Sequence, residues 1–368
     1  MTVNVNSERF AKESVEFNKN KATDIGTDYN FKRAIVWPNA IGFLVLHALG
    51  FYGIYLCFKC NLLTVAWTFF MAFASGEGIT IGAHRLYSHK SFKATFTLRL
   101  ILNILQTVAG QNCMYIWVRD HRQHHKYSDT DGDPHNASRG FFFSHMGWLM
   151  SKKHPMVIKK GKCIDMSDLE ADSIVMFQKK YYKLLYMVFA IAIPVAVPIY
   201  FWNETFVNSF IVAYILRYTL LLNITWLVNS AAHLYGTKPF DKFILPVESK
   251  FVAFVSIGEG WHNYHHTFPW DYRAAEFGSR YGVTTMVIDA CFYLGLAYDL
   301  RTTPYEMIEK RTQRTGDGSR QLFGHERKKV EGEIQQSQEN GSCDMKKRRS
   351  AKTDLDYEKV PALTTARG

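Results

Sequence analysis

Histidines at regular spacing are the residues of this chain best suited to chemistry. Three clusters hold eight of its fourteen histidines: His84 and His89 in HRLYSH, His121, His124 and His125 in HRQHHKY, and His262, His265 and His266 in WHNYHH. Two clusters share the spacing HxxHH, which on a helix projects the imidazoles from one face. Neutral imidazole binds iron, copper, zinc and nickel, and the number present exceeds the needs of one tetrahedral site. The spacing predicts a multi-histidine centre, most simply of two metals.

Four apolar stretches must position these histidines. They lie at about residues 34–57, 62–82, 183–202 and 207–231. Each is near the ~20 residues with which a helix crosses the hydrocarbon core of a membrane. A buried helix of a soluble protein is the alternative for each. Four of this length, in two close pairs, favour a membrane protein.

The distribution of Lys and Arg indicates an orientation. Lys59 is the only basic residue between the first two stretches, and residues 203–206 contain none, whereas fifteen Lys and Arg fall from Arg85 to Lys180. By the positive-inside rule, both termini and the central segment face the cytoplasm. All three histidine clusters then lie on the same side of the membrane and can converge.

The ends of the chain differ from its middle. Residues 1–30 are polar and irregular, without the apolar core or cleavage site of a signal peptide, and we expect them to be flexible. Residues 313–368 are poor in apolar side chains, which favours disorder. The net charge of +11 fits anionic lipid or an anionic substrate, and nothing in the sequence is typical of a nucleic-acid module. Six cysteines without regular spacing do not form a disulfide framework.

Four motifs resemble those of the membrane fatty acid desaturases, and specifically the acyl-CoA desaturases of animals. They are HRLYSH (84–89), HRQHHKYSDTDGDPHN (121–136), NSAAH (229–233) and WHNYHHTFPWDYR (261–273), within a resemblance that covers roughly residues 30–312. The ILPVE stretch (244–248) and the long tail are more similar to insect members, such as moth pheromone desaturases. The resemblance implies an all-α protein of the endoplasmic reticulum membrane, with a domain at 31–312 in which four transmembrane helices support a cytoplasmic helical cap holding the dimetal centre.

The implied reaction removes two hydrogens from a long-chain acyl-CoA with O2, forming a delta-9 or delta-11 double bond, for example in pheromone synthesis. Zinc has no redox chemistry, so two irons are the expected metals. The chain contains neither a GxGxxG dinucleotide fingerprint in a strand-to-helix context nor a fused HPGG haem motif. A separate cytochrome b5 and its reductase are therefore the implied electron donors.

The resemblance also assigns further site residues. His233 matches a ninth metal ligand, and Asn229 matches a residue that holds a metal through water. Positions that contact CoA are Asn39, Asn112, Arg119, Asp120, Lys152 and Lys153. Positions that line the acyl tunnel are Ala72, Gly76, Gln111, Trp117, Thr225 and Trp226. Ala72 stands where vertebrate members have a bulky aromatic near the closed end, so we expect a deeper tunnel. Lys152 and Lys153 as a lipid-facing basic patch, and the tryptophans as interfacial belt residues, are the alternatives.

Other polar residues near the clusters have simpler expected roles. Carboxylates that can orient imidazoles are Asp120, Asp129, Asp131 and Asp133. We expect His135 to support a ligand, and His47 and His145 to be packed or hydrogen-bonded. Glu77, within the second apolar stretch, has no assigned role although a carboxylate there is costly.

Two other functions fit parts of the pattern. A membrane fatty-acid or alkane hydroxylase shares the three histidine clusters and inserts oxygen instead. A non-enzymatic metal-binding membrane protein would need ionisable residues along the membrane pathway, whereas the histidines lie at one face.

Overall fold

The computed structural model describes residues 25–276 and 282–322. The chain forms two compact units, residues 1–317 and 318–368, and the described part of the second contains the 3-10 helix η7 (Ser319–Leu322). The expected flexible ends lie largely outside the described residues, and that expectation stays a prediction. The helix α17 (Tyr305–Thr315) runs past residue 312, where we expected the tail to begin.

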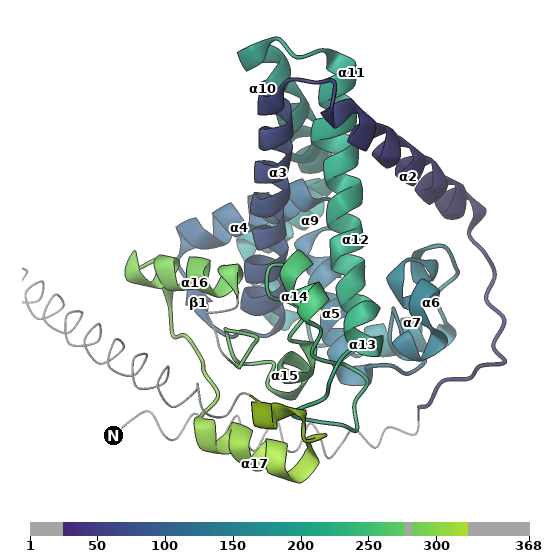
Figure 1. Ribbon diagram of the computed structural model, residues 1–368, viewed down its shortest axis with the longest axis vertical. Coiled ribbons are helices and arrows are strands. Elements are labelled where there is room, and N and C mark those ends of the chain that lie inside the picture. Colours follow the sequence, from purple (N-terminus) through teal and green to yellow (C-terminus); the bar gives the residue numbers. More distant parts are fainter. Residues whose placement is uncertain (1–24, 277–281, 323–368) are drawn as a thin grey trace, which may run out of the picture. The chain divides into compact units, whose positions relative to one another are not determined.

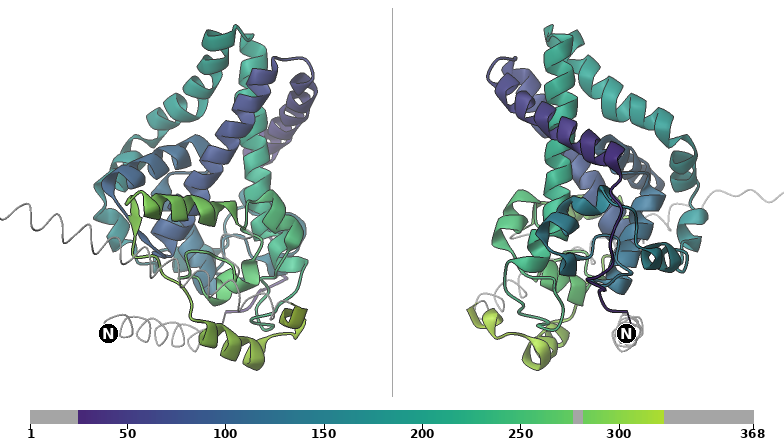
Figure 2. Two further views of the ribbon diagram at one scale, coloured as in Figure 1. Left: turned by 60° about the vertical axis from the view of Figure 1, so that its left-hand side comes forward. Right: turned by 90° about the vertical axis from the view of Figure 1, so that its right-hand side faces the viewer.

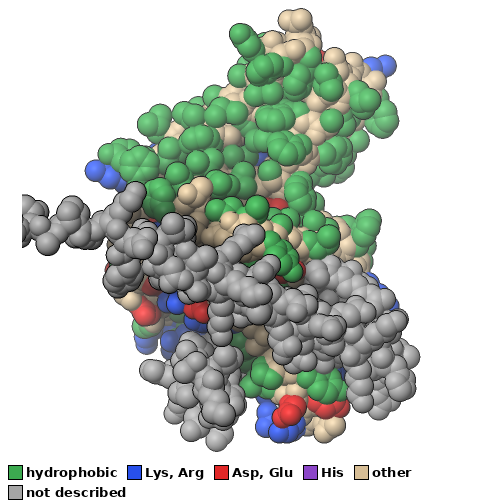
Figure 3. Space-filling model, turned by 90° about the vertical axis from the view of Figure 1, so that its left-hand side faces the viewer, with side chains coloured by type: hydrophobic (Ala, Val, Ile, Leu, Met, Phe, Trp, Pro, Cys, Tyr) green, Lys and Arg blue, Asp and Glu red, His purple; other side chains and the backbone are tan. Residues whose placement is uncertain are grey.

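Four helices of the first unit are long and apolar enough to cross a membrane, as the sequence predicted. They are α2 (Trp37–Cys57); α3 (Leu62–Glu77) with the π-helical η1 (Gly78–Ser88); α9 (Ser173–Leu185) with π-helical η4 (Tyr186–Ala192) and α10 (Ile193–Trp202); and α11 (Phe206–Asn208) with π-helical η5 (Ser209–Leu216), α12 (Arg217–Asn229) and α13 (Ala231–Leu234). Large hydrophobic side chains are exposed along them, for example Phe51 and Phe70. Figure 3 shows hydrophobic side chains over most of the face that these helices occupy.

Three of the four spans extend beyond the apolar stretches read from the sequence. The second continues to Ser88, the third begins at Ser173, and the fourth covers Phe206–Leu234. These extensions contain polar side chains, so a hydropathy pattern does not assign them to a span. In the structure the polar side chains are buried against the cap: Gln178, His84 and His233 are all nearly inaccessible. These three spans therefore continue into the cap, the third across a kink at Tyr181 and the fourth across an interruption at Ser230.

A polar clamp joins the two short loops between paired spans. Glu204 accepts hydrogen bonds from the backbone N–H of Asn61 (2.8 Å), the hydroxyl of Thr64 (2.8 Å) and the backbone N–H of Thr205 (2.9 Å). Asn61 and Thr205 in turn cap the helices that follow them, α3 and α11, by accepting from backbone N–H groups. The clamp holds the two hairpins together at the end of the spans far from the histidines.

Short helices form a cap at the other end of the spans. They are α4 (Phe96–Ala109), α5 (Met114–Tyr127), η2 (Ala137–Arg139), α6 (Phe141–His145), η3 (Gly147–Leu149), α7 (Pro155–Gly161), α8 (Ser167–Glu170), α14 (Lys250–Val255), α15 (His262–Thr267), α16 (Val283–Tyr293) and α17. Within the described residues, the strands are β1 (Lys93–Ala94) and β2 (Ala297–Tyr298), an antiparallel pair. Figures 1 and 2 show α5, α13 and α15 gathered at this end of α3 and α12. The all-α prediction is confirmed.

The main hydrophobic core lies where the second span enters the cap. Ile81 and Leu86 of η1 pack there with Leu102 of α4, Val118 of α5 and Ile288 of α16, all buried. Each pairing brings together elements distant in sequence, so burial of this apolar surface fixes η1 against α4, α5 and α16. The core therefore positions two of the three histidine clusters.

Gly78 allows α4 to approach the start of η1. A Cβ atom at this position would lie 2.5 Å from the carbonyl carbon of Leu105, which is backbone and cannot move aside. We expect Gly78→Ala to destabilise the fold by about 1–3 kcal/mol, seen as a melting temperature several degrees lower in a thermal-shift assay. Gly42→Ala on α2 is the matched control, because nothing lies within 4 Å of its Cβ position. Equal melting temperatures for the two variants would contradict this account.

Candidate metal centre and acyl cavity

The nine histidines nominated as ligands converge in the cap as two groups of nitrogen donors. The first group is His84, His89, His121, His125 and His265, and the second is His124, His233, His262 and His266. Within each group all the donor atoms lie within 4.8 Å of one another. The groups are adjacent, since the rings of His125 and His266 stack with centroids 4.1 Å apart. A histidine-rich cluster able to bind metal is therefore present.

Helical spacing divides each HxxHH cluster between the two groups. On α5, His121 and His125 are four residues apart and face the first group, whereas His124 faces the second. On α15 the division is reversed: His262 and His266 face the second group and His265 the first. Two helices with the same spacing thus complete each other's groups.

A π-helical turn brings His84 and His89 together. Residues five apart do not share a face of an α-helix. Here the backbone N–H of His89 donates to the carbonyl of His84 (3.2 Å), which is the i→i+5 bond of a π-helix. Both imidazoles therefore enter the first group. The spacing in the sequence gave no signal for this turn.

Buried carboxylates fix the tautomers of three imidazoles. The Nδ1 atoms of His84, His124 and His233 contact Glu259 (2.9 Å), Asp133 (2.8 Å) and Asp129 (3.1 Å), respectively. A proton held on Nδ1 and donated to a carboxylate leaves a free lone pair on Nε2, which is the arrangement of metal-binding histidines.

Sequence reasoning found part of this carboxylate set. The sequence predicted that Asp129 and Asp133 orient imidazoles, as they do, but it did not predict this role for Glu259. The one indication in the sequence was that Glu259 lies three residues before His262. The other two carboxylates that it named do not orient the cluster: Asp120 pairs with Arg119, and Asp131 with Arg139 and His154.

Electrostatics keep these groups in the required charge states. Burial opposes ionisation of Glu259, but the charge of Arg85, 2.7 Å away, and the contact with His84 lower its pKa to about 2. Burial also opposes ionisation of Asp129, yet His233 lowers its pKa overall. Burial, followed by the charges of neighbouring histidines, lowers the pKa well below the usual value at six imidazoles: His89, His121, His125, His262, His265 and His266. These imidazoles are therefore neutral at physiological pH, as metal ligands must be.

The geometry of the opposed nitrogens fits bound cations. The Nε2 atoms of His84 and His265 lie 2.9 Å apart, and those of His124 and His266 3.3 Å apart. Because Nδ1 of His84 and of His124 donates to a carboxylate, their Nε2 lone pairs point at another ring nitrogen. A cation can bind between such a pair when the partner nitrogen is also unprotonated. Nine nitrogen donors in two groups suit two metal ions that prefer imidazole.

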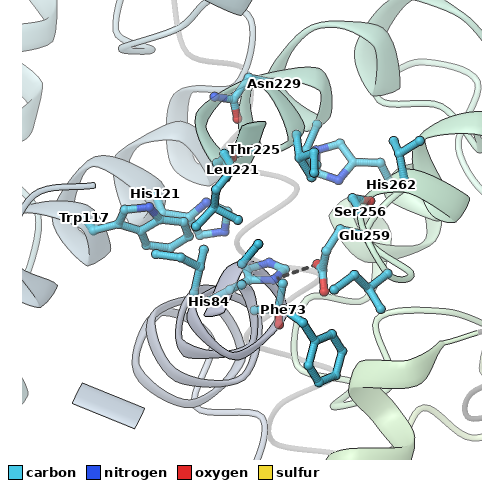
Figure 4. A pocket seen from close by; sticks show the side chains of 18 of the residues that line it. Phe73, His84, Trp117, His121, Leu221, Thr225, Asn229, Ser256, Glu259 and His262 are labelled. Carbon is cyan, nitrogen blue, oxygen red and sulfur yellow. Dashed lines mark hydrogen bonds and ion pairs between the residues drawn. The ribbon is translucent and has the colours of Figure 1, made fainter. Parts of the chain in front are cut away.

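Two cavities of about 250 Å³ each adjoin the cluster. The first, here the histidine cavity, is lined by Ala72, Gly76, Leu221 and Val228 and by His84, His121, His124 and His262. Figure 4 shows His84, His121 and His262 at this cavity, with the contact between His84 and Glu259 dashed. The second, the turn cavity, is lined by Phe43, Gln111, Asn112 and Trp226. Both cavities share Trp117, His121, Thr225 and Asn229, so they meet beside the metal cluster.

All six residues nominated for the acyl tunnel line one or both cavities. Gln111 donates a hydrogen bond to the hydroxyl of Thr225 (2.8 Å) where the cavities meet. Asn229 also lies at this junction, near the histidines, but it belongs to neither group of donors. The indole of Trp226 is buried against Phe43 (5.5 Å between ring centroids) and not at a surface belt.

The residues nominated for binding CoA do not all line one cavity. A third, polar cavity of about 570 Å³ in the cap is lined by Arg119, Asp120 and Lys153, with Tyr115 and Lys162. Asn112 lines the turn cavity instead. Lys152 is exposed, and Asn39 donates to the carbonyl of Leu149 (2.8 Å); neither lines these three cavities.

Of the remaining polar residues, Glu77, His47 and His145 are held by side-chain hydrogen bonds. Glu77 is buried and accepts from Thr80 (3.1 Å) and Thr284 (3.3 Å), which joins α3 to the start of α16. His135 lies beside His124, with ring centroids 4.3 Å apart. His47 and His145 both contact Asn223, at 3.1 and 3.2 Å.

Comparison with known proteins defines the class. The sequence matches the fatty acid desaturase family over residues 60–275, and the chain belongs to this family. The resemblance to acyl-CoA desaturases that the histidine motifs suggested is thereby confirmed. The chain is 55% identical to "Acyl-CoA Delta-9 desaturase" of Acheta domesticus, an alignment that covers 80% of this chain and 82% of that protein.

Other relatives are nearly as similar. The chain is 52% identical to "Stearoyl-CoA desaturase" of Homo sapiens, over 77% of this chain and 79% of that protein. It is 49% identical to "Acyl-CoA Delta(11) desaturase" of Trichoplusia ni, over 78% and 83%. The chain is thus about equally similar in sequence to vertebrate and insect relatives, and to relatives named for different double-bond positions.

Glu259 offers a test of how the carboxylates support the cluster. We expect Glu259→Gln to weaken metal binding by about 10–100-fold, because the amide can turn its donor group toward His84 and no longer selects the Nδ1–H tautomer. Metal content per chain would be measured by mass spectrometry after dialysis against graded chelator. Glu306→Gln on α17, where the side chain is 85% exposed, is the control. Equal metal retention in both variants would contradict the assigned role.

Proposed function

We propose that this protein is an acyl-CoA desaturase, which uses O2 to remove two hydrogens from a long-chain acyl-CoA and form a double bond. The observation that carries the proposal is the histidine cavity: an apolar chamber within the spans whose wall includes four imidazoles of the cluster. Such a chamber suits an acyl chain and brings it beside the metal positions.

Two irons, held by the nine histidines with Asn229 acting through water, are the proposed cofactor. Redox-active metal ions activate O2 and so supply the oxidising power that no side-chain acid, base or nucleophile has. The nitrogen-rich donor set and the neutral imidazoles support this assignment.

The chain's own contribution is to orient the substrate and exclude water. The bend between the two cavities, formed by Trp117, Thr225 and Gln111, is the proposed place where the acyl chain turns past the cluster. Fixing the chain there presents one pair of methylenes to the metals. The mainly apolar wall of the histidine cavity keeps water from the site.

The CoA group is proposed to bind at the cap. Arg119 and Lys153 line the polar cap cavity and are positioned to meet phosphate groups. Both contact Asp120, at 2.7 and 3.4 Å, and its carboxylate offsets the repulsion between the two cations before substrate binds. Asn39, Asn112 and Lys152 complete the proposed set of contacts.

We propose an endoplasmic reticulum location, with both termini and the cap in the cytoplasm. The excess of Lys and Arg in the cap segment and their scarcity in the two short loops support this orientation. Cytochrome b5 and its reductase are the proposed electron donors.

The position of the double bond is proposed to be delta-9 or delta-11, for example in pheromone synthesis. Relatives named for delta-9, delta-11 and delta-12 positions all lie at 49–55% identity, so similarity does not discriminate between them. The small residues Ala72 and Gly76 line the far part of the histidine cavity and support a deep tunnel.

Expression in a desaturase-deficient yeast tests the reaction. We expect a new monoene, with its double bond located by derivatisation and mass spectrometry, and we expect it to disappear in His121→Ala because a ligand is lost. Lys126→Ala, on the exposed side of the same helix, should retain the product. Hydroxylated fatty acids in place of the monoene would show that the protein is a hydroxylase.

Ala72→Tyr tests the depth of the tunnel. The added ring fills space in the histidine cavity, so we expect the ratio of long-chain to short-chain products to fall about tenfold or more. Ala66→Tyr, at an exposed position of the same helix, is the control. An unchanged chain-length and position profile in Ala72→Tyr would contradict a deep tunnel.

A further inference from the structure

Arg217 is a buried cation within the fourth span. Its side chain is fully inaccessible, and none of the ion pairs among the described residues includes it. A guanidinium does not lose its proton in proteins, so the charge itself is buried. An unpaired charge at such a place is costly and is retained only where something compensates it.

Three backbone carbonyls provide the compensation. Arg217 donates to the carbonyls of Val108 (2.9 Å), Ala190 (2.9 Å) and Ala213 (3.1 Å). Val108 lies in the last turn of α4, where backbone carbonyls have no partner within the helix. This is also the negative end of the helix dipole, which favours a nearby cation. Ala190 and Ala213 lie in the π-helical segments η4 and η5, where the ordinary α-helical bonding is interrupted. One cation thus joins α4, the third span and its own span through three backbone carbonyls.

The turn that follows α4 is fixed from several sides. Gly110 has a left-handed backbone (φ 74°), and its carbonyl accepts from the hydroxyl of Tyr218 at 3.4 Å. Gln106 donates to the carbonyl of Asn112 (2.7 Å), and Gln178 accepts from the backbone N–H of Met114 (2.8 Å). Arg217 and Tyr218, adjacent on α12, hold the start of this turn.

This turn is also a wall of the substrate path. Gly110, Gln111 and Asn112 line the turn cavity, as does Tyr218. The α5 helix begins two residues after the turn, so the place of the turn also affects where Trp117 and His121 stand. A displaced turn would change the distance between the carboxyl end of the acyl chain and the metal cluster.

We propose that Arg217 and Tyr218 are positioning residues for regiochemistry. By holding the turn at residues 110–112, they set how far the acyl chain enters before it meets the cluster, and so which methylene pair is oxidised. The inference rests on the proposed desaturase function. A purely structural role for Arg217 would lower the amount of active enzyme without changing the position of the double bond.

The test compares three variants with the parent protein in desaturase-deficient yeast. Arg217→Lys keeps the charge but loses the fork of donors, and Tyr218→Phe removes one hydroxyl. Tyr214→Phe is the matched control, because its hydroxyl contacts Tyr186 (2.7 Å) and not the turn. We expect both test variants to give mixed double-bond positions and Tyr214→Phe to give the parent's single position. Tyr218→Phe decides the question if Arg217→Lys fails to fold.

A second measurement reports on the turn without any turnover. Cys113 follows the turn directly and is buried, whereas Cys163 is exposed and serves as the internal reference. Loosening the turn should raise the alkylation rate of Cys113 relative to Cys163 by about fivefold, as expected for the loss of one hydrogen bond. Tyr214→Phe should leave this ratio unchanged.

The outcomes separate this inference from the proposed function. Mixed positions together with faster alkylation of Cys113 support the inference. Unchanged positions with lowered yield, or equal alkylation in all variants, overturn it. If the parent protein forms no monoene, the desaturase proposal is overturned and regiochemical control falls with it. The alkylation rates of Cys113 would still show whether Arg217 and Tyr218 hold the turn.

Discussion

The site depends on bringing nine imidazoles together in a largely buried place. Where two unprotonated ring nitrogens face one another at about 3 Å their lone pairs repel, and low dielectric strengthens that repulsion. The fold meets the constraint with buried carboxylates that hold the imidazole protons on the far nitrogens, as Glu259 does for His84. Arg85, on the other side of Glu259, keeps that carboxylate ionised. The cluster is therefore a layered arrangement of charges and not a set of ligands alone.

Irregular helix geometry serves this arrangement. The π-helical turn of η1 directs His84 and His89 into one group, and Arg217 donates to one carbonyl in η4 and one in η5. Such turns are less favourable than α-helix and persist where surrounding contacts determine them. In this chain η1 lies at the histidine cluster, whereas η4 and η5 lie within the third and fourth candidate spans.

Much of this could be predicted from the sequence. Hydropathy identifies four spans, and the repeated HxxHH spacing identifies α5 and α15 as donors, because both signals follow directly from helix periodicity. The π-turn at His89 and the role of Glu259 could not be predicted, since they arise from contacts between distant segments. Asp120 and Asp131 are nearer in sequence to the histidines than Glu259 is to His84, yet they pair with arginines. Proximity in the sequence is a poor guide to which carboxylate supports a ligand.

The distribution of ligands between α5 and α15 has a consequence for biosynthesis. Each group of donors includes at least one histidine from α15, so the first group is complete only once His265 has been made and the second only once His266 has been made. By then the segments of all four candidate spans have been synthesised. The donors on η1, α5 and α13 thus exist before the last of the histidine helices, and no metal ion can have a full group of donors before α15 is made.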